Sequence, residues 1–299
     1  MTIEPVAHRP DPFGRWLVIG AAGMLGTEVT TALAGREVTA LDVPEVDITD
    51  ERSAARAVDG HDVVVNCAAW TAVDEAEARE ADAFRVNATG VANLAAAARD
   101  RGAWMLHVST DYVFAGDARE PYPEDALLDP RSAYGRTKAA GEWALRSLLP
   151  DRSILLRTAW LYGTHGPNFV RTMARLAAGS NPVDVVDDQI GQPTWARDLA
   201  GRLVECVDAG VPAGVYHGTN SGRTSWFGFA REIFSRVGAD PGRVRQTTTD
   251  RFPRPAQRPS FSVLGHAAWH RVGLAPMPEW EDAFDRALAS GMLAESAEK

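Results

Sequence analysis

The sequence predicts an α/β protein with a doubly wound parallel sheet and a smaller C-terminal lobe. Short, almost continuously apolar runs alternate with helical stretches along the first half of the chain. Such runs are typical of parallel strands that helices cover on both faces. A glycine-rich turn follows the first run, and an acid, Asp42, ends the second. Together these features predict a Rossmann domain that binds a dinucleotide.

The strands of the sheet are expected in the first half of the chain. We predict them, in chain order, at residues 16–19, 37–41, 62–66, 104–108 and 153–157. We expect helices over residues 24–34, 81–100 and 132–148. Each of these helices separates two strands, so the connections are the crossovers that parallel pairing requires.

After about residue 160 the alternation loosens. Helices are expected at 168–178, 197–209, 226–237 and 279–288, strands at 183–186 and 214–217, and a Pro/Arg-rich loop at 252–260. We therefore divide the chain into a loose N-terminal tail (1–15), a dinucleotide-binding domain (16–165, with 191–219 returning to it) and a substrate-binding lobe (166–190 and 220–299). The lobe is expected over the carboxyl ends of the strands, where such sheets bind ligands.

Composition excludes several classes of protein. The net charge of −9 gives no electrostatic basis for binding nucleic acid or an anionic membrane. No apolar run approaches the ~20 residues that cross a bilayer, and the first 15 residues lack the apolar segment of a secretory signal. We therefore expect a cytoplasmic protein with no membrane partner. Cys67 and Cys206 fit no metal-ligand spacing, so no metal site is predicted.

The glycine turn is the expected cofactor site. Gly20, Gly23 and Gly26 follow a strand and open a helix that continues with Met24 and Leu25. Glycine lets the chain turn sharply and lets its backbone approach a diphosphate at the helix N-terminus. We expect all five residues to border the cofactor.

Asp42 bears on which cofactor binds. It lies 22 positions beyond Gly20, at the end of the second strand, and no arginine follows it directly. A carboxylate there accepts hydrogen bonds from both ribose hydroxyls of NAD and repels a 2′-phosphate. The cofactor is expected to be NADH or NADPH, with NADH favoured. The alternative is that Asp42 is a solvated loop acid.

Four further residues are candidates for cofactor contact. Asp47 is placed to bind the adenine amino group and Ile48 to cover the ring, although Asp47 equally suits a helix cap or turn. Ala68 and Ala69 follow the third strand and let the backbone pass close to the cofactor. Tight packing would also explain these two small residues.

Two short segments carry the expected chemistry, Ser109-Thr110-Asp111-Tyr112 and Tyr134-Gly135-Arg136-Thr137-Lys138. Hydride addition to a ketone builds negative charge on its oxygen, so the site must donate a proton there. We expect Tyr134 to be this acid and Thr110 to hydrogen-bond the same oxygen. Lys138 lies on the same helical face as Tyr134, and its ammonium is expected to lower the tyrosine pKa from ~10. The alternative is an ordinary helix pair without function.

These segments, with others, resemble the dTDP-4-dehydrorhamnose reductase family, an extended branch of the short-chain dehydrogenases. The matching positions are 66–74, 86–89, 109–114, 134–138, 157–160, 168–169 with Met173, 187–189, 191–194 and 258–259. The resemblance runs in order from about residue 17 to about residue 290. It implies reduction of the 4-keto group of dTDP-4-dehydro-L-rhamnose to give dTDP-L-rhamnose. Tyr112 stands where related 4,6-dehydratases carry a glutamate, which favours plain reduction over dehydration.

The resemblance also implies roles for further residues. Lys138 is expected to bind the nicotinamide ribose, and the cofactor site gains Trp70, Asn87 and Val108. The substrate residues implied are Thr110, Asp111 at a sugar hydroxyl, Trp160 against the sugar ring, Asn168 in a closing loop with Gln189, and Arg258 as a fork for the diphosphate. Arg171 and Arg254 are alternatives for the diphosphate.

Two positions depart from the family pattern. Some members dimerise through a magnesium held by glutamates; Glu28 matches one such ligand, but Arg197 stands at another. This arginine argues against a bridging magnesium, so either a monomer or a homodimer is expected. Trp70 replaces the usual tyrosine or histidine, which weakens the assignment of one particular sugar.

Two other functions stay open. The first is reduction of a sibling dTDP-4-ketosugar in an antibiotic or aminoglycoside pathway, with the same catalytic residues. The second is a non-catalytic regulatory subunit resembling the methionine adenosyltransferase β subunit. The intact set of Thr110, Tyr134 and Lys138 counts against the second.

Overall fold

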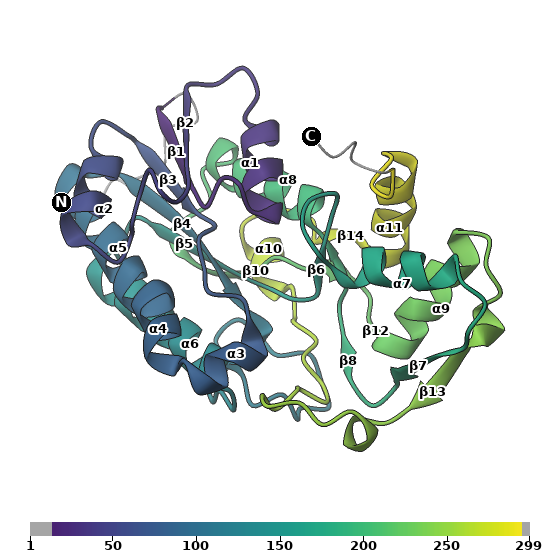
Figure 1. The fold of residues 1–299 in the computed structure, drawn as a ribbon. Coiled ribbons are helices and arrows are strands. Elements are labelled where there is room, and N and C mark those ends of the chain that lie inside the picture. Colours follow the sequence, from purple (N-terminus) through teal and green to yellow (C-terminus); the bar gives the residue numbers. More distant parts are fainter. Residues whose placement is uncertain (1–13, 295–299) are drawn as a thin grey trace.

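The computed structural model describes residues 14–294 and has a central sheet flanked by helices, with a smaller lobe beside it (Figure 1). In this part of the chain six strands form the sheet, in the order β10-β5-β4-β3-β1-β2, and every neighbouring pair is parallel. The strands are β1 (Trp16–Ile19), β2 (Val38–Leu41), β3 (Val63–Asn66), β4 (Trp104–Thr110), β5 (Ser153–Thr158) and β10 (Gly214–His217). The predicted fold class is confirmed.

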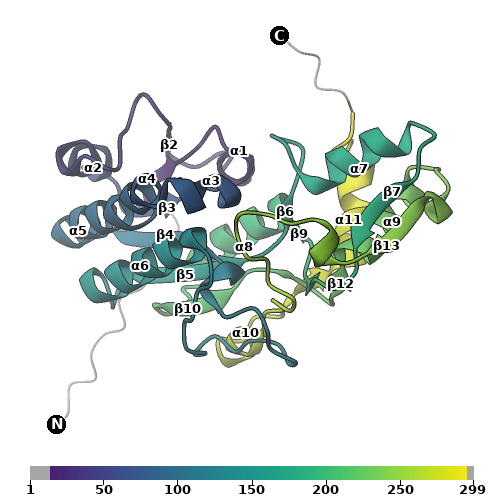
Figure 2. The ribbon, with the colours of Figure 1, turned by 60° about the horizontal axis from the view of Figure 1, so that its bottom comes forward.

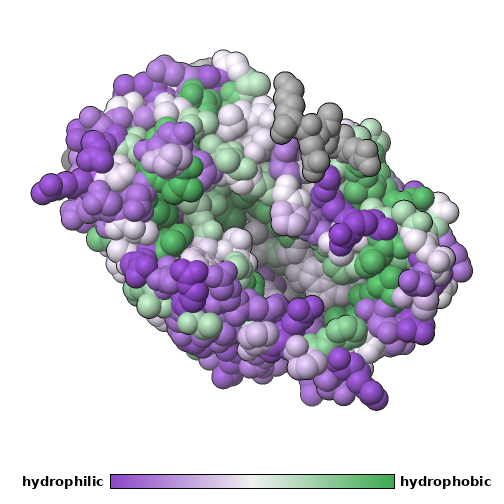
Figure 3. Space-filling model, viewed as in Figure 1, coloured by the Kyte–Doolittle hydropathy of each residue, from purple (hydrophilic) through white to green (hydrophobic). Residues whose placement is uncertain are grey.

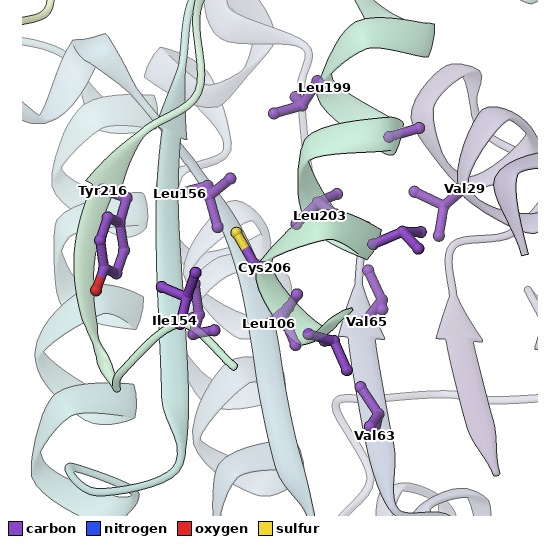
Figure 4. Packing of buried hydrophobic residues seen from close by; sticks show 14 of the residues in the cluster. Val29, Val63, Val65, Leu106, Ile154, Leu156, Leu199, Leu203, Cys206 and Tyr216 are labelled. Carbon is purple, nitrogen blue, oxygen red and sulfur yellow. The ribbon is translucent and has the colours of Figure 1, made fainter. Parts of the chain in front are cut away.

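Helices cover both faces of this sheet because successive strand residues point to opposite sides. They are α1 (Met24–Ala32), α2 (Glu51–Val58), α3 (Val73–Ala78), α4 (Glu80–Phe84), α5 (Val91–Arg101), α6 (Ala133–Leu148), α8 (Ala196–Asp208) and α10 (Ala267–Arg271). Val63, Val65 and Leu106 pack with α1 and α8 on one face, whereas Val64 and Met105 pack with α2, α5 and α6 on the other. Figure 4 shows the first face, where α8 directs Leu199, Leu203 and Cys206 toward the strands.

The order of the strands creates a place for a ligand. The chain runs from β1 outward to β2 and then returns to β3 on the other side of β1. The connections that leave the carboxyl ends of β1 and β3 therefore diverge and open a crevice between them. The glycine turn that follows β1 lies at this crevice.

The lobe has its own apolar core, built from aromatic side chains such as Tyr162, Phe229 and Phe284. Its helices are α7 (Phe169–Ala177), α9 (Trp226–Arg236) and α11 (Trp280–Ala289), beside the parallel pair β7 (Val183–Val186) and β13 (Val244–Thr247) (Figure 2). Shorter strands pair with one another outside the main sheet: β6 (Leu161–Tyr162) with β9 (Thr194–Trp195), β8 (Ile190–Gly191) with β12 (Thr224–Ser225), and β11 (Asn220–Ser221) with β14 (Met277–Glu279).

Part of the chain that we expected in the lobe packs against the sheet domain. Trp269 of α10 stacks on Tyr216 of β10 with ring centroids 4.7 Å apart, and both lie in the core beneath α8. The division into domains stays a prediction, and most of its tail, residues 1–13, lies outside the described residues. Within residues 14–294 the structure has no helix long and apolar enough to span a membrane.

Candidate active site

A cavity of about 500 Å³ lies at the carboxyl ends of β1, β3, β4 and β5, and Figure 3 shows the surface hollowed between the sheet domain and the lobe. Many of the predicted site residues meet in it although they are far apart in the sequence. Those that line the cavity are Gly20, Gly23, Met24, Leu25, Gly26, Ala69, Val108, Thr110, Asp111, Tyr134, Lys138 and Trp160.

A second cavity of about 490 Å³ adjoins the first, because Tyr112 and Trp226 line both. Arg258 lines this second cavity with Arg254, Gln189 and aromatic residues of the lobe. The remaining predicted residues line neither cavity: Asp42, Asp47, Ile48, Ala68, Trp70, Asn87 and Asn168. The two cavities together offer one space for a dinucleotide and another for a nucleotide-linked substrate.

The turn after β1 is built so that only glycine fits. Gly20 has φ +78°, and a Cβ on it would lie 2.6 Å from the backbone nitrogen of Ala68. A Cβ on Gly26 would lie 2.0 Å from the carbonyl oxygen of Gly20. The turn therefore brings bare backbone to the start of α1, which is the shape that a diphosphate requires.

Asp42 lies beside this turn. Its Oδ2 accepts a hydrogen bond from the backbone nitrogen of Ala22 at 2.8 Å, and its Oδ1 accepts one from Val43 at 2.8 Å. The backbone thus fixes the carboxylate at the glycine turn, which a solvated loop acid would not need. This placement suits recognition of a ribose next to the diphosphate.

Three predicted cofactor residues have internal partners. Asp47 accepts hydrogen bonds from the backbone nitrogen and the hydroxyl of Thr49, as a turn acid does, and Ile48 is buried in the core. The Asn87 side chain binds both backbone groups of Trp70 and the Thr137 hydroxyl. Asn87 therefore ties the segment after β3 to α6, and cofactor contact by these residues stays a prediction.

Thr110 and Asp111 form a buried pair at the end of β4. Thr110 Oγ1 donates to Asp111 Oδ1 at 2.9 Å and accepts from the backbone nitrogen of Tyr112 at 3.2 Å. Asp111 is only 2% exposed, and its Oδ2 makes no hydrogen bond of standard geometry among the described residues, although the Ser262 side chain lies close enough to favour the carboxylate. Burial raises the pKa of Asp111 to about 6. A buried acceptor at the cavity suits a sugar hydroxyl, because an unpaired one is costly.

Tyr134 and Lys138 lie on α6, whose N-cap, Ser132, accepts from the backbone nitrogen of Gly135 at 3.1 Å. The expected lowering of the tyrosine pKa is wrong for this structure. Burial raises the pKa of Tyr134 to about 12, and the Thr110 hydroxyl opposes this only in part. Lys138 Nζ instead donates to the carbonyl oxygen of Val108 at 2.7 Å, and burial lowers the lysine pKa to about 8. Excluding water from the phenol therefore dominates the pKa of Tyr134.

Trp160 is the one non-glycine residue among residues 14–294 with a positive φ, 47°. Its ring stacks on Trp226 of the lobe, with centroids 3.6 Å apart and planes 11° apart. Strained backbone of this kind persists only where the surroundings fix it. Trp160 is half-buried at the cavity, so it is not a fully buried core tryptophan.

Sequence reasoning missed Trp226 as a site residue. It begins α9, distant in sequence from every predicted catalytic segment, yet it lines both cavities. Its signal was the aromatic cluster at residues 226–229. Tyr112 also lines both cavities, and its ring meets that of Tyr134 edge-on with centroids 5.6 Å apart. The sequence pointed to Tyr112 only as the residue that stands where related dehydratases carry a glutamate.

The arginines considered for the diphosphate differ in their surroundings. Arg258 Nη2 pairs with Asp74 Oδ2 at 2.8 Å, and its side chain is 19% exposed. Arg254 lines the same cavity. Arg171 instead donates to the carbonyl oxygens of Thr164 and Met292, so it connects loops of the lobe.

The position considered for magnesium holds an ion pair. Arg197 Nε lies 3.1 Å from Oε2 of the buried Glu28. The described residues contain no cluster of three or more His, Cys, Asp or Glu side chains that could hold a metal.

A glycine cradle beside Thr110, Tyr134 and Lys138 defines an NAD(P)H-dependent oxidoreductase of the short-chain dehydrogenase type. The family model described as "RmlD substrate binding domain" matches residues 14–292. The chain belongs to the dTDP-4-dehydrorhamnose reductase family, as its motifs indicated.

Individual relatives agree with this assignment. The chain is 52% identical over 282 residues to a dTDP-4-dehydrorhamnose reductase of Streptomyces griseus, covering 92% of this chain and 93% of that one. It is 50% identical over 277 residues to a dTDP-4-keto-6-deoxy-D-glucose reductase of Streptomyces niveus (91% and 96% covered). Among solved structures, a dTDP-4-dehydrorhamnose reductase from Bacillus anthracis in complex with NADP matches with a TM-score of 0.89 and 35% identity, covering 93% of this chain and 99% of that one.

Proposed function

We propose that this protein reduces the 4-keto group of a dTDP-4-dehydro-6-deoxysugar with NAD(P)H, and that its main substrate is dTDP-4-dehydro-L-rhamnose. The observation that carries the proposal is the meeting of Thr110, Tyr134 and Lys138 with the glycine turn in one cavity. The Streptomyces griseus relative, at 52% identity, carries the name of this activity.

The fit of a nicotinamide dinucleotide rests on the glycine turn, which lines the cavity as bare backbone at the start of α1. Gly20, Gly23 and Gly26 would hold its diphosphate, Asp42 a ribose, and Lys138 the nicotinamide ribose. When bound, it supplies the hydride that the carbonyl carbon receives.

Tyr134 supplies the proton in this proposal. Its raised pKa, about 12, keeps the phenol protonated at neutral pH, so its hydroxyl is ready to donate to the substrate oxygen. An alkoxide that forms on this oxygen is a stronger base than the phenolate, so the proton moves in the required direction. Thr110 Oγ1 provides a second hydrogen bond to the same oxygen, turning away from Asp111 to do so.

The second cavity suits the rest of the substrate. Arg254 and Arg258 offer cations for the diphosphate, and Phe169 and Phe252 offer aromatic faces for the thymine. Asp111 Oδ2 then accepts a sugar hydroxyl, and Trp160 covers the ring. Asn168 contributes by capping α7, which places Phe169 at the cavity.

We further propose a preference for NADH, supported by the fixed carboxylate of Asp42. The Bacillus anthracis relative was solved with NADP, so kcat/KM for NADH and NADPH must be compared directly. Changing Asp42→Ala should lower the ratio of kcat/KM for NADH to kcat/KM for NADPH. A wild-type preference for NADPH would contradict the proposed preference for NADH.

Arg197, paired with Glu28, supports a site without magnesium. A cytoplasmic location and a monomeric or homodimeric state stay predictions.

One specific observation favours a sibling substrate as the second candidate. The Streptomyces niveus relative, named for dTDP-4-keto-6-deoxy-D-glucose, is 50% identical, nearly as similar as the first. The catalytic residues are the same for either sugar, so they do not distinguish the two substrates.

The deciding experiment is NADH and NADPH oxidation with each of the two dTDP-ketosugars, with the product identified by NMR. We expect the larger kcat/KM with dTDP-4-dehydro-L-rhamnose. Tyr134→Phe should lower kcat by roughly 100- to 10,000-fold while cofactor affinity and melting temperature stay the same. If neither sugar were turned over while the cofactor still bound tightly, the regulatory alternative would be supported. Near-normal turnover by Tyr134→Phe would exclude Tyr134 as the acid.

A further inference from the structure

Lys138 is unusual both in the composition of the chain and in its surroundings. Only two of the 31 basic residues are lysines, Lys138 and Lys299. Lys138 is 2% exposed, and its Nζ lies 2.7 Å from the carbonyl oxygen of Val108 and 3.4 Å from His107 Nε2. Because this buried amine has so few acceptors, the groups around it determine whether it is an amine or an ammonium.

Asn66 decides how His107 presents itself to this amine. The backbone nitrogen of Ala68 can only donate, so the Asn66 oxygen must face it, at 3.1 Å. The Asn66 amide nitrogen therefore faces His107 Nδ1, at 3.1 Å, and donates to it. A neutral ring that accepts at Nδ1 carries its hydrogen on Nε2. Burial and Lys138 hold the pKa of His107 well below its ordinary value and outweigh the backbone of Asn66, which acts in the opposite direction, so the ring is neutral.

The hydrogen on Nε2 thus points at Lys138 Nζ. An ammonium presents only hydrogens, whereas an amine presents a lone pair that can accept this hydrogen. The contact therefore favours the amine over the ammonium, in the same direction as burial. His107 extends from β4 and Asn66 from β3, so the sheet itself fixes the arrangement.

The other groups around Nζ do not reverse this preference. Glu142, on the same helix, favours the ammonium, but its carboxylate is already bound by the buried Arg157, with Nη2 2.7 Å from Oε2. Cys67, after β3, is a neutral thiol because burial raises its pKa to about 12. The Val108 carbonyl accepts a hydrogen from either form of the lysine.

We propose that Asn66 and His107 are positioning residues for Lys138, which make it a group that gains and loses a proton near neutral pH instead of a permanent cation. The consequence for turnover rests on the proposed function. After Tyr134 has given its proton to the substrate oxygen, the Lys138 ammonium gives one proton to the phenolate and becomes an amine. Water then returns a proton to the amine, so the site is restored without a further reactant.

The test uses the scarcity of lysine. In a Lys299→Arg protein labelled with lysine carrying ¹³C at Cε, Lys138 gives the only lysine signal, and its shift is followed against pH. We expect a midpoint near 8, as the lowered pKa indicates, against ~10.4 for an ordinary lysine. An ordinary midpoint in this protein, which needs no change at the site, would overturn the proposal.

Two variants then test the partners. In Asn66→Asp the carboxylate accepts from both Ala68 and His107 Nδ1, so Nε2 becomes an acceptor for the ammonium, and the midpoint should rise by about one unit or more. His107→Phe removes the opposing hydrogen and should also raise it. Asn93→Asp, on α5, adds the same charge elsewhere and should leave the midpoint unchanged. Unchanged midpoints in both site variants would overturn the proposal.

Activity provides a separate readout. The alkaline fall of kcat should move to higher pH in Asn66→Asp, while its KM for the cofactor stays the same, which a purely structural defect would not produce. The NMR titration needs no substrate. A protein with the expected midpoint but no turnover would refute the proposed function and not this inference.

Discussion

Asp111 is a carboxylate that the fold holds where its charge is unfavourable. It is 2% exposed, and burial raises its pKa to about 6, from ~3.9 in an unfolded chain. The native state therefore binds the proton more tightly than the unfolded state does. Between about pH 4 and pH 6 stability falls as pH rises, and above pH 6 the full cost remains. A destabilising acid at a cavity is typical of a residue kept for binding.

We predict that Asp111→Asn makes the protein more stable and less active. At pH 7 the free energy of unfolding should rise by up to about 3 kcal/mol, the equivalent of a shift of about two pKa units. At pH 4 the gain should be nearly absent, because the wild-type carboxyl is then largely protonated. Urea unfolding at both pH values measures this, and kcat/KM for the sugar should fall.

Asp62→Asn is the matched control for this prediction. A hydrogen bond from the backbone nitrogen of Arg15 lowers the pKa of Asp62, so this acid contributes stability above its unfolded pKa. The control should therefore lose some stability at pH 7. If Asp111→Asn were equally destabilised at pH 4 and pH 7, the buried charge of Asp111 would not be what lowers the stability of the wild type at pH 7.

At the scale of elements, α6 is seated directly on the turn that holds Thr110 and Asp111. A Cβ on Gly135 would lie 2.2 Å from the carbonyl oxygen of Tyr112. Tyr134 precedes this contact by one residue, so the approach of the helix fixes the distance between the tyrosine and Thr110. Gly135 thus allows α6 to approach the turn closely. The spacing of Tyr134 and Lys138 alone does not indicate this role.

Gly135→Ala should therefore impair catalysis more than stability would explain. We expect kcat to fall at least about tenfold, because small displacements of a catalytic group are costly, with a loss of about 1–3 kcal/mol from overpacking. Gly201→Ala is the control: the space around Gly201 in α8 is open, so alanine should stabilise the helix by about 0.5–1 kcal/mol. Unaltered kcat in Gly135→Ala would show that the helix position is not critical.

Strands β1, β3, β4 and β5 were predictable because their apolar runs are buried on both faces, whereas the edge strand β2 is partly exposed. Strands β1 and β10 were predicted without error, and the other four strands of the sheet differ by one or two residues at their ends. Strand β13 was not predicted: it lies at the edge of the lobe, and its exposed Arg245 and Gln246 give no apolar pattern. The single helix expected at 81–100 contains a π-helical turn, η1 (Arg85–Gly90), which residue propensities do not signal.

At the scale of the whole molecule, the sheet domain and the lobe meet through contacts beside the cavities. Trp160 stacks on Trp226, and Asp74 pairs with Arg258. The meeting of Thr110, Tyr134 and Lys138 in one cavity was predictable because local motifs and strand ends carry these residues. Trp226 and the Asp74 partner of Arg258 were not, because only the packing of distant segments brings them to the site. In the proposed function a diphosphate bound by Arg258 would have to compete with the Asp74 carboxylate.

The Trp160–Trp226 stack leads to a prediction about this junction. Trp226 borders both cavities, and its ring stacks on Trp160. Trp226→Ala should raise KM for the dTDP-sugar about tenfold, which corresponds to losing one aromatic contact of about 1–1.5 kcal/mol. The KM for the cofactor should change little, since the glycine turn and Asp42 are untouched.

Trp143→Ala provides the comparison that separates this effect from a general loss of tryptophan. Trp143 is 55% exposed on α6 and lines neither cavity of the site. Its removal should leave both KM values unchanged. If Trp226→Ala also left the sugar KM unchanged while lowering the melting temperature, the stack would only join the lobe to the sheet domain. A selective rise would mean that the lobe positions Trp160 for the sugar, and that specificity within this family is set partly by residues outside the catalytic domain.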